Sequence, residues 1–430
     1  MAGPGAAGSG VEGVESFRRR ARGWLAANLP PARPTTGALL RGHRSDEDEL
    51  EEVARQRDLQ RRLFEGGFAG ICMPTEYGGQ GLTPAHQEAF NEELVGYDYP
   101  SILQVPTMTP CAAVLLEFGS EELKRRHLPA ILRGDEIWSQ LLSEPSGGSD
   151  AAGAQTTAVR DGDEWVLNGS KIWTSGAWWS DWGLCLARTN WDVPKHRGLT
   201  VFVLPLHQPA VEIHRIEMVN GSREFCQEFL TDVRVPDGDR VGDVDGGWSV
   251  GTRWMYHERT VAGGSPYVTR ATDFRLEGYN AFRPEDVLEL AAIAGREGDP
   301  GVLELVGEAR TLGLVEEALS ARVAAAIAAG ALPDQAAAIT RLFHGTASAR
   351  VATIGYQVGG DAAVAWGGDD DTDLGARAGI GFLMRQATSI AGGTVEMARN
   401  VIAERVMGMP REVAADRHVP FRQVPRGAPH

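Results

Sequence analysis

Residues 142–150 read Leu-Ser-Glu-Pro-Ser-Gly-Gly-Ser-Asp, and residues 171–175 read Lys-Ile-Trp-Thr-Ser. The first stretch is rich in glycine and hydroxyl groups, so its backbone N–H groups and serines can approach phosphate or carbonyl oxygens closely. The second is a short β-branched and aromatic strand that ends on hydrogen-bond donors. Between them, Asn168-Gly169 lies within apolar runs and predicts a hairpin turn. An ordinary turn and hairpin would fit these residues, and so would a site for a flat cofactor with polar edges.

Length and composition restrict the class of protein. A chain of 430 residues suggests two or three domains. Its 43% hydrophobic and 23% charged residues are typical of a soluble globular protein. The net charge of −16 argues against binding to a nucleic-acid backbone. No uninterrupted apolar run approaches the length of a membrane-spanning helix, so we expect no membrane contact.

The four cysteines are Cys72, Cys111, Cys185 and Cys226, and their spacing fits neither a disulfide framework nor a metal site. We therefore expect reduced thiols, a cytoplasmic location and no bound metal. Residues 1–10 are rich in glycine and alanine and are predicted to be a disordered tail. An apolar segment of the kind found in signal peptides is absent from the start of the chain.

The hydrophobic period changes twice along the chain. Apolar residues recur at three- and four-residue spacing in the first part, which predicts helices that include 46–64 and 112–132, the latter broken at Gly119-Ser120. The period then becomes two, with predicted strands at 164–167, 183–187, 199–206 and 211–214. The last part is rich in alanine and leucine and predicts long helices over 300–330 and 334–358. The order helix, sheet, helix indicates an α+β protein.

Five strings in this order resemble the acyl-CoA dehydrogenase family, over residues 14 to 412. They are Pro74-Thr-Glu-Tyr-Gly-Gly-Gln-Gly81, the 142–150 turn, the 171–175 strand, Val233-Arg-Val-Pro236 with Gly246-Gly-Trp248, and Gly393-Thr-Val-Glu-Met-Ala-Arg-Asn-Val-Ile-Ala403. The resemblance implies an N-terminal helical domain at 11–135, a middle β-barrel domain at 136–245 and a C-terminal four-helix bundle at 246–430. It also implies bound FAD. The chain has no G-x-G-x-x-G after a strand, so a Rossmann site is not expected.

The resemblance assigns flavin contacts to the two opening stretches. Leu142 and Ser143 should lie along the edge of the flavin ring, and Trp173 should pack against it. Ser175 should donate toward N5, and Ser149 should reach the pyrophosphate or the substrate's pantetheine. Donors at these places would stabilise the charge that the ring gains on reduction. Each serine could equally be a turn or cap residue.

A second set of cofactor residues is implied near the C-terminus. Gln357-Val-Gly-Gly360 resembles a family loop that touches the adenine side of a neighbouring subunit's cofactor. Thr394 and Glu396 should meet the cofactor of the same or an adjacent subunit. A flavin site shared in this way implies at least a dimer.

The catalytic base is expected on an unusual element. Many family members carry a glutamate two residues before the Thr of the Gly-Thr motif, but that position here is Gly392. Members that act on branched or long acyl chains place the base in a Glu-Arg pair after the β domain, and Glu258-Arg259 matches this pattern. Glu258 is our candidate base, with Arg259 beside the substrate and the Gly392 N–H donating to the thioester oxygen. The alternative is a surface carboxylate paired with a nearby cation.

One family motif is missing. An Arg-x-x-Phe-Gly string normally reaches the flavin pyrophosphate across the subunit interface, and the corresponding region reads Ala294-Gly-Arg-Glu-Gly-Asp-Pro300. Arg296 is a partial substitute, and Arg270 and Arg275 are further candidates. The omission leaves two arrangements open, a homo-oligomer and a hetero-oligomer in which a related subunit completes the site.

Three functions remain open. The first is FAD-dependent dehydrogenation of an acyl-CoA, for example a fatty acyl or sterol side-chain thioester, to the trans-2-enoyl-CoA. Glu258 would remove the α-proton, hydride would pass to flavin N5 and an electron-transfer flavoprotein would accept the electrons. The second is a non-catalytic or half-site subunit of a hetero-oligomeric acyl-CoA dehydrogenase. The third is oxidase or other flavin chemistry.

Overall fold

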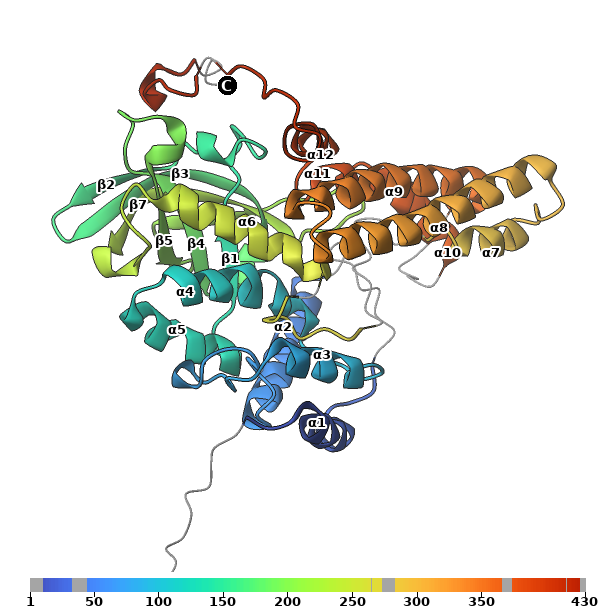
Figure 1. Cartoon of the computed structure of the whole chain (residues 1–430), viewed down its shortest axis with the longest axis horizontal. Helices are drawn as coiled ribbons and strands as arrows, with labels where there is room; N and C mark the ends of the chain where they lie inside the picture. Colours follow the sequence, from blue (N-terminus) through green and yellow to red (C-terminus); the bar gives the residue numbers. More distant parts are fainter. Residues whose placement is uncertain are drawn as a thin grey trace, which may run out of the picture.

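Three groups of elements follow one another along the chain (Figure 1). The computed structural model describes residues 11–32, 45–263, 265–272, 283–365, 373–414 and 416–425. The expected tail at 1–10 and the candidate Arg275 lie outside these residues. Helices form the lower part of the view in Figure 1, a sheet lies above them, and the last helices project to the right as an arm. The predicted α+β fold class and its order of helical, sheet and helical regions are confirmed.

The N-terminal helices are α1 (Val14–Asn28), α2 (Asp46–Glu65), α3 (Pro84–Glu93), α4 (Ala113–Phe118) and α5 (Glu121–Arg133). Helix α2 begins where the Ser45 hydroxyl accepts a hydrogen bond from Asp48 N–H at 3.1 Å. Ser120 caps α5 through Leu123 N–H at 3.2 Å, which explains the predicted break between α4 and α5. Apolar residues of α1 are buried at four-residue spacing. The face of the helix that the sequence period makes apolar is therefore the face that packs into the core.

One apolar stretch in this region differs from the expectation that no apolar run approaches the length of a membrane-spanning helix. Ser101–Phe118 is long and apolar enough, by length and composition, to cross a membrane. In the structure 67% of it is buried, and it is divided into short helical turns followed by α4. Burial against the other helices is sufficient to account for its apolar composition.

The strands form one eight-stranded sheet with the order β6-β7-β3-β2-β4-β5-β8, and β1 pairs with β4. Their bounds are β1 (Trp138–Leu141), β2 (Thr157–Asp161), β3 (Glu164–Ser175), β4 (Trp182–Arg188), β5 (Leu199–Pro205), β6 (Val211–Arg215), β7 (Phe225–Pro236) and β8 (Arg240–Val241). The four strands predicted from the period of two are present. Strand β3 lies against β7 over ten paired residues and against β2 on its other edge.

The predicted hairpin at Asn168-Gly169 is wrong, because β3 runs straight through these residues. The strand register shifts between Leu167 and Gly169, because Asn168 lies opposite two residues of β7, Thr231 and Asp232, which form a bulge in that strand. Asn168 exchanges two hydrogen bonds with Asp232 on β7, at 3.0 and 2.9 Å. A methyl group at Gly169 would lie 2.6 Å from Thr156 Oγ1, so glycine is required there by the close approach of a neighbouring segment.

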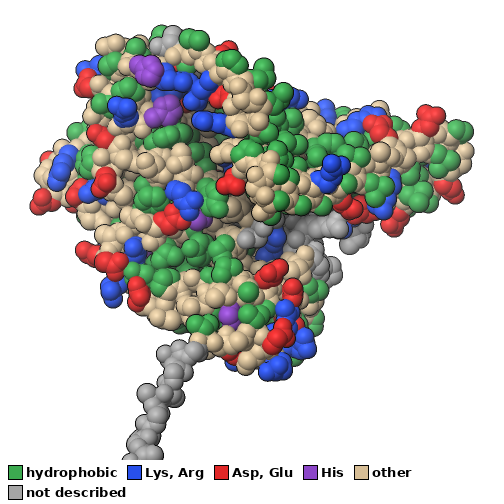
Figure 2. Space-filling view, in the orientation of Figure 1, with side chains coloured by type: hydrophobic (Ala, Val, Ile, Leu, Met, Phe, Trp, Pro, Cys, Tyr) green, Lys and Arg blue, Asp and Glu red, His purple; other side chains and the backbone are tan. Residues whose placement is uncertain are grey.

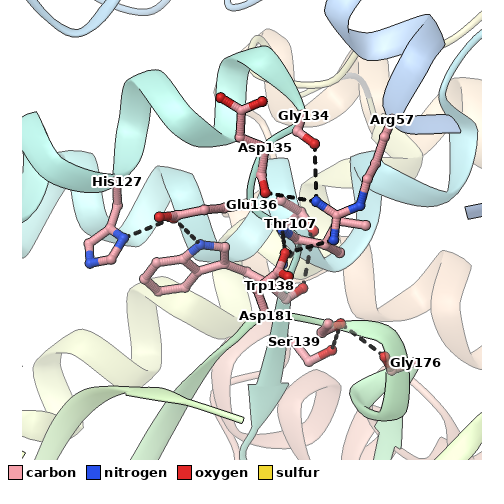
Figure 3. A network of polar contacts seen from close by, with 12 residues as sticks. Arg57, Thr107, His127, Gly134, Asp135, Glu136, Trp138, Ser139, Gly176 and Asp181 are labelled. Atoms are coloured by element: carbon pink, nitrogen blue, oxygen red, sulfur yellow. Dashed lines mark hydrogen bonds and ion pairs between the residues drawn. The ribbon is translucent and has the colours of Figure 1, made fainter. Parts of the chain in front are cut away.

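Polar contacts join the N-terminal helices to the start of the sheet (Figure 3). The Arg57 guanidinium of α2 binds the Asp181 carboxylate at 2.8 Å, and Asp181 also accepts from Ile137 N–H at 2.7 Å. Thr107 and Trp138 exchange two hydrogen bonds, at 3.0 and 3.1 Å. These contacts fix β1 relative to the helices, and β1 leads directly into the 142–150 turn.

The C-terminal helices begin with α6 (Gly247–Gly263), which lies beside the sheet. The arm contains α7 (Asp286–Ile293), α8 (Pro300–Ala328), α9 (Ala337–Gly359) and α10 (Leu374–Met384). Helices α11 (Ala387–Ile390) and α12 (Val395–Val401) lie at the end of the arm nearest the sheet (Figure 1). Of the 29 residues of α8 only Val302, Ala309 and Val323 are buried, and apolar side chains lie along the arm's surface (Figure 2).

Candidate active site

A buried ion pair fastens the 142–150 turn to β3. Lys171 Nζ lies 2.8 Å from Glu144 Oε1, with both side chains at most 4% exposed. Lys171 also donates to the Leu186 carbonyl at 2.6 Å. Glu144 accepts from the N–H groups of Gln155 and Thr156, at 2.6 and 2.9 Å. The pKa of Glu144 is lowered, because the Lys171 charge and these hydrogen bonds outweigh the opposing effect of burial.

Trp173 lies next to this turn in an unusual conformation. Its φ of +64° falls in the left-handed region, and the register between β3 and β7 shifts at this residue. Its side chain remains 52% exposed and meets the edge of Phe225. A bulky residue in this backbone conformation costs about 1–2 kcal/mol. An exposed indole held in a strained bulge is typical of a residue that meets a ligand.

Hydrogen-bond donors surround this indole. Ile172 N–H donates to the Ser143 carbonyl at 3.0 Å, which brings Ser143 beside Trp173. Ser175 is held in place, because the Ser139 hydroxyl of β1 donates to its carbonyl at 2.9 Å. The hydroxyls of Ser143, Ser149 and Ser175 make no hydrogen bond with any described residue. Leu142 packs against the main hydrophobic core just before Ser143. The structure thus brings together the residues predicted for the flavin ring.

Glu258 approaches the same turn from α6. It is half-buried, and it shares a side-chain hydrogen bond with Gln140 of β1, two residues before Leu142. The indole N–H of the fully buried Trp254 donates to Gln140 Oε1 at 2.7 Å, which turns the Gln140 amino group toward Glu258. Burial raises the pKa of Glu258, whereas Arg259 and Gln140 act in the opposite direction. Glu258 is therefore a half-buried carboxylate with a raised pKa, next to Gln140 of β1.

The neighbouring residue His257 points toward α4. Its Nε2 lies 2.8 Å from Glu117 Oε1 of α4, and Glu117 also binds Arg253 at 2.6 Å. The Arg253 hydrogen bond, followed by that of His257, lowers the pKa of Glu117. Glu117 is thus an ionised, paired carboxylate that anchors α6, in contrast to Glu258.

The loop at Gly392-Gly393 faces α6. A methyl group at Gly393 would lie 3.9 Å from the Arg259 guanidinium, and one at Gly392 would meet no atom within 4 Å. Both residues have positive φ, +67° and +96°, so a glutamate at 392 would be strained. No described residue accepts a hydrogen bond from either N–H. The site thus has open space and free donors where the usual family base would stand.

Within the second set of predicted cofactor residues, the Gln357–Gly360 loop lies far from the Gly392 loop. Arg341, near the start of α9, donates to the Thr388 and Ala391 carbonyls beside Gly392. Gln357 is sixteen residues further along α9, about 24 Å away at the helical rise. Arg296 donates to the Gln357 carbonyl at 2.8 Å and borders Gly360. One chain therefore holds two separated groups of site residues.

Thr394 and Glu396 are adjacent to Gly392 in sequence but take ordinary helical roles in the single chain. The Thr394 hydroxyl accepts from Met397 N–H at 3.1 Å and caps α12. Glu396 is exposed and lies 3.7 Å from Arg399. Neither residue contacts the turn at 142–150 in any described hydrogen bond or ion pair.

Sequence reasoning missed four polar residues that support the site, namely the partly buried Gln140 and the buried Glu144, Lys171 and Glu228. Glu228 lies on β7 opposite Lys171 in the strand register and is fully buried. It accepts a hydrogen bond from the Thr174 hydroxyl at 2.7 Å, and its second oxygen has no hydrogen-bond partner among the described residues. Burial raises its pKa to about 8. Charged residues inside apolar strands were the available signal, because such charges are rarely buried unpaired.

Comparison with known proteins agrees with this geometry. Residues 14–135 match the model of the acyl-CoA dehydrogenase N-terminal domain, and residues 139–233 match the model of the middle domain. The chain is 34% identical over 404 residues to acyl-CoA dehydrogenase IpdE1 of Mycobacterium tuberculosis, covering 94% of this chain and 99% of that protein. It is 31% identical to acyl-CoA dehydrogenase FadE34 of the same organism, covering 91% of this chain and 51% of that protein. The chain belongs to the acyl-CoA dehydrogenase family.

Solved structures show the same architecture. The Tcur3481–Tcur3483 steroid acyl-CoA dehydrogenase superimposes with a TM-score of 0.68 at 26% identity, covering 93% of this chain and 98% of that chain. The ChsE4–ChsE5 complex of Mycobacterium tuberculosis superimposes with a TM-score of 0.65 at 24% identity, covering 95% of this chain and 100% of that chain. The second likeness concerns the fold alone.

The protonation of Glu228 leads to a stability prediction. Its folded-state pKa of about 8 exceeds the ordinary value of 4.5, so the folded protein retains a proton that the unfolded chain releases between these values. The free energy of unfolding should therefore fall by up to about 1.4 kcal/mol per pH unit from this group as pH rises through that window. Glu228→Gln removes the titration, so its stability relative to the wild type should increase from pH 5 to pH 8. Denaturant unfolding at several pH values measures this, and a constant difference between the two proteins would contradict it.

Proposed function

We propose that this protein catalyses the FAD-dependent α,β-dehydrogenation of an acyl-CoA thioester to the trans-2-enoyl-CoA, with Glu258 as the base. The observation that carries the proposal is the position of Glu258, a desolvated carboxylate hydrogen-bonded to Gln140, beside the turn that holds Ser143. Arg259, the next residue of α6, borders Gly393, and the N–H groups of Gly392 and Gly393 make no hydrogen bond with any described residue. A base and hydrogen-bond donors for an enolate oxygen are the two requirements for removing a proton next to a thioester.

The residues around Trp173 fit a flavin. The exposed indole offers a flat face, and the hydroxyls of Ser143 and Ser175 are free to donate to polar ring edges. Leu142 would border the ring, and Ser149 would reach phosphate or pantetheine oxygens. Bound FAD would supply the hydride acceptor for the reaction. The chain's own contribution is to orient the ring and to keep Glu258 next to the substrate's α-carbon.

The strength of the Glu258 carboxylate as a proton acceptor depends on its surroundings. Its raised pKa makes the carboxylate a better proton acceptor than an exposed glutamate. Donation from the Gly392 N–H to the thioester oxygen would stabilise the negative charge that develops as the proton leaves. Arg259 acts in the opposite direction to burial and limits the rise in the pKa of Glu258.

For the substrate we propose a bulky acyl group, such as a branched or steroid-derived thioester. The absence of a side chain at Gly392 leaves space next to the base. The likeness to a solved steroid acyl-CoA dehydrogenase supports the same class of substrate.

We propose an electron-transfer flavoprotein as the electron acceptor, so oxygen alone should not sustain turnover. An oxidase would be recognised by oxygen-dependent turnover without that acceptor.

The site is proposed to be shared between chains. The Gln357–Gly360 loop and Arg296 lie about 24 Å from the Gly392 loop along α9 and are therefore placed to serve a neighbour's cofactor. Apolar residues on the arm, including Leu303, Leu314 and Val315 of α8, are 44–50% exposed in the single chain, which is expected if a second chain covers them. The neighbour is a second copy or a related subunit. A half-site role within a hetero-oligomer is the alternative function.

All four cysteines are free, in keeping with the cytoplasmic location that we also propose.

Glu258→Gln tests the base. We expect kcat to fall by at least about 100-fold, because general-base catalysis contributes this much, while the flavin absorbance of the purified protein stays the same. Glu117→Gln, on the neighbouring α4, is the control and should cost stability with a small change in kcat. In the wild type, kcat/KM should fall as pH decreases through the raised pKa of Glu258. Equal losses in the two variants would contradict the assignment.

Trp173 provides a test of the flavin face. Trp173→Ala should lower FAD affinity about 10-fold or more, because a base or ring stacked on an aromatic residue loses about 1–3 kcal/mol on its removal. Trp173→Gly should bind FAD equally weakly, yet be about 1 kcal/mol more stable to unfolding than Trp173→Ala, since glycine relieves the left-handed backbone. Phe229→Ala, a partly exposed aromatic on β7, is the control for FAD binding. Wild-type FAD affinity in Trp173→Ala would exclude this face as the flavin contact.

Co-expression of two inactive variants tests the shared site. Glu258→Gln damages the group near the sheet, and Arg296→Ala damages the group at the far end of α9. In a homo-oligomer a mixed pair would contain one intact site, so about a quarter of wild-type activity should return. If both variants bind FAD and no activity returns, each chain holds a complete site. A colourless wild type that gains flavin only with a related chain would support the hetero-oligomer.

A further inference from the structure

The bulge at Trp173 is flanked on both sides by buried polar side chains. Lys171 lies two residues before it and binds Glu144, while Thr174 follows it directly and donates to Glu228 at 2.7 Å. Lys171, Thr174 and Glu228 are each at most 1% exposed. Trp173 itself points outward. The extra residue of the bulge reverses the usual alternation, so that Lys171 and Thr174 both face the interior.

Glu228 connects the two sides of the bulge across the sheet. It is the register partner of Lys171 on the neighbouring strand and the hydrogen-bond acceptor of Thr174. Its other oxygen has no partner among the described residues, so Thr174 provides the one side-chain hydrogen bond that this carboxyl makes there. A buried carboxyl with an unsatisfied oxygen is unfavourable for folding. A packed apolar residue would stabilise the sheet better, which indicates that the polar contact serves another purpose.

The strained backbone of Trp173 accounts for the buried hydrogen bond between Thr174 and Glu228. A left-handed tryptophan in a strand would relax to an extended conformation unless its neighbours were fixed. The Thr174 hydrogen bond fixes the residue that follows, and the Lys171 ion pair fixes the residue two positions before. Relaxation would turn the indole away from Ser143 and Ser175, to which the same strand brings it close.

We propose that Thr174 and Glu228 form a positioning pair that holds Trp173 in its exposed, left-handed conformation against the flavin. This inference rests on the proposed function, because it takes the flavin to be the ligand of Trp173. Neither residue of the pair touches the reacting atoms. They act through the conformation of Trp173 and, with it, the orientation of Ser175.

The experiment compares three variants of the holoprotein, co-expressed with its partner chain if flavin binding requires one. Thr174→Val keeps the side-chain shape and removes the hydrogen bond. Thr174→Ser keeps the hydrogen bond and removes a methyl group. Thr200→Val is the matched control: Thr200 is fully buried on β5 of the same sheet and hydrogen-bonds with Thr189 and with Asp245 N–H, at 2.8 and 2.9 Å. The dissociation constant of FAD, the flavin absorbance spectrum and the unfolding midpoint are measured for each.

A positioning role predicts that Thr174→Val weakens FAD binding about 10-fold or more and shifts the flavin spectrum, because small misplacement of a contact has large effects. Thr174→Ser should return the affinity to within about threefold of the wild type. Thr200→Val should lower the unfolding midpoint with unchanged FAD affinity. The inference is overturned if Thr174→Val binds FAD as the wild type does, or if Thr174→Ser is as weak as Thr174→Val. A wild type that binds no FAD with any partner would instead reject the proposed function.

Discussion

The ion pair between Lys171 and Glu144 is the interaction on which the rest of the site depends. Burying two charges is unfavourable unless the pair is close and its remaining hydrogen-bonding capacity is satisfied. Here the Leu186 carbonyl and the Gln155 and Thr156 N–H groups satisfy it. Because breaking such a pair leaves an uncompensated charge, the turn at 142–150 and the strand beside it behave as one rigid unit. Ser143 and Trp173 owe their proximity to this contact.

Rigidity around this unit gives the site its chemical character. The strained bulge leaves the Trp173 indole exposed. Glu258 of α6 lies next to Gln140 of β1, and the Gln140 side-chain oxygen accepts a hydrogen bond from Trp254. Because Gly392 has no side chain, it leaves open space in a loop whose backbone is left-handed. Its N–H has no hydrogen-bond partner among the described residues. In the proposed mechanism Glu258 of α6 takes the place of a base in the loop, and the Gly392 N–H of the loop serves as the donor.

The sequence predicted the order of the elements well, because the change from a helical period to a period of two needs no tertiary information. The assignment of Glu258 and the turn residues to the site came from the family resemblance and remains a prediction. Asn168-Gly169 was misread as a hairpin because the local turn signal cannot reveal that Thr156 and Asp232 approach from distant segments. Gln140 and Glu228 escaped notice for the same reason, since their partners Trp254 and Thr174 are distant in sequence and carry no motif. The separation of Gln357 from Ser143 likewise became visible once α9 was seen to run along the arm.

This separation underlies the proposed shared site, in which residues of two chains would together complete one active site. The most direct test is to separate the purified protein by size and to measure mass by light scattering and FAD by absorbance in each fraction. A shared site predicts flavin in the oligomeric fractions, one for each complementary pair of half-sites, and colourless monomers. Monomers that carry one FAD per chain would contradict the account, because the residues near Ser143 and Trp173 would then suffice without a neighbour's Gln357 loop.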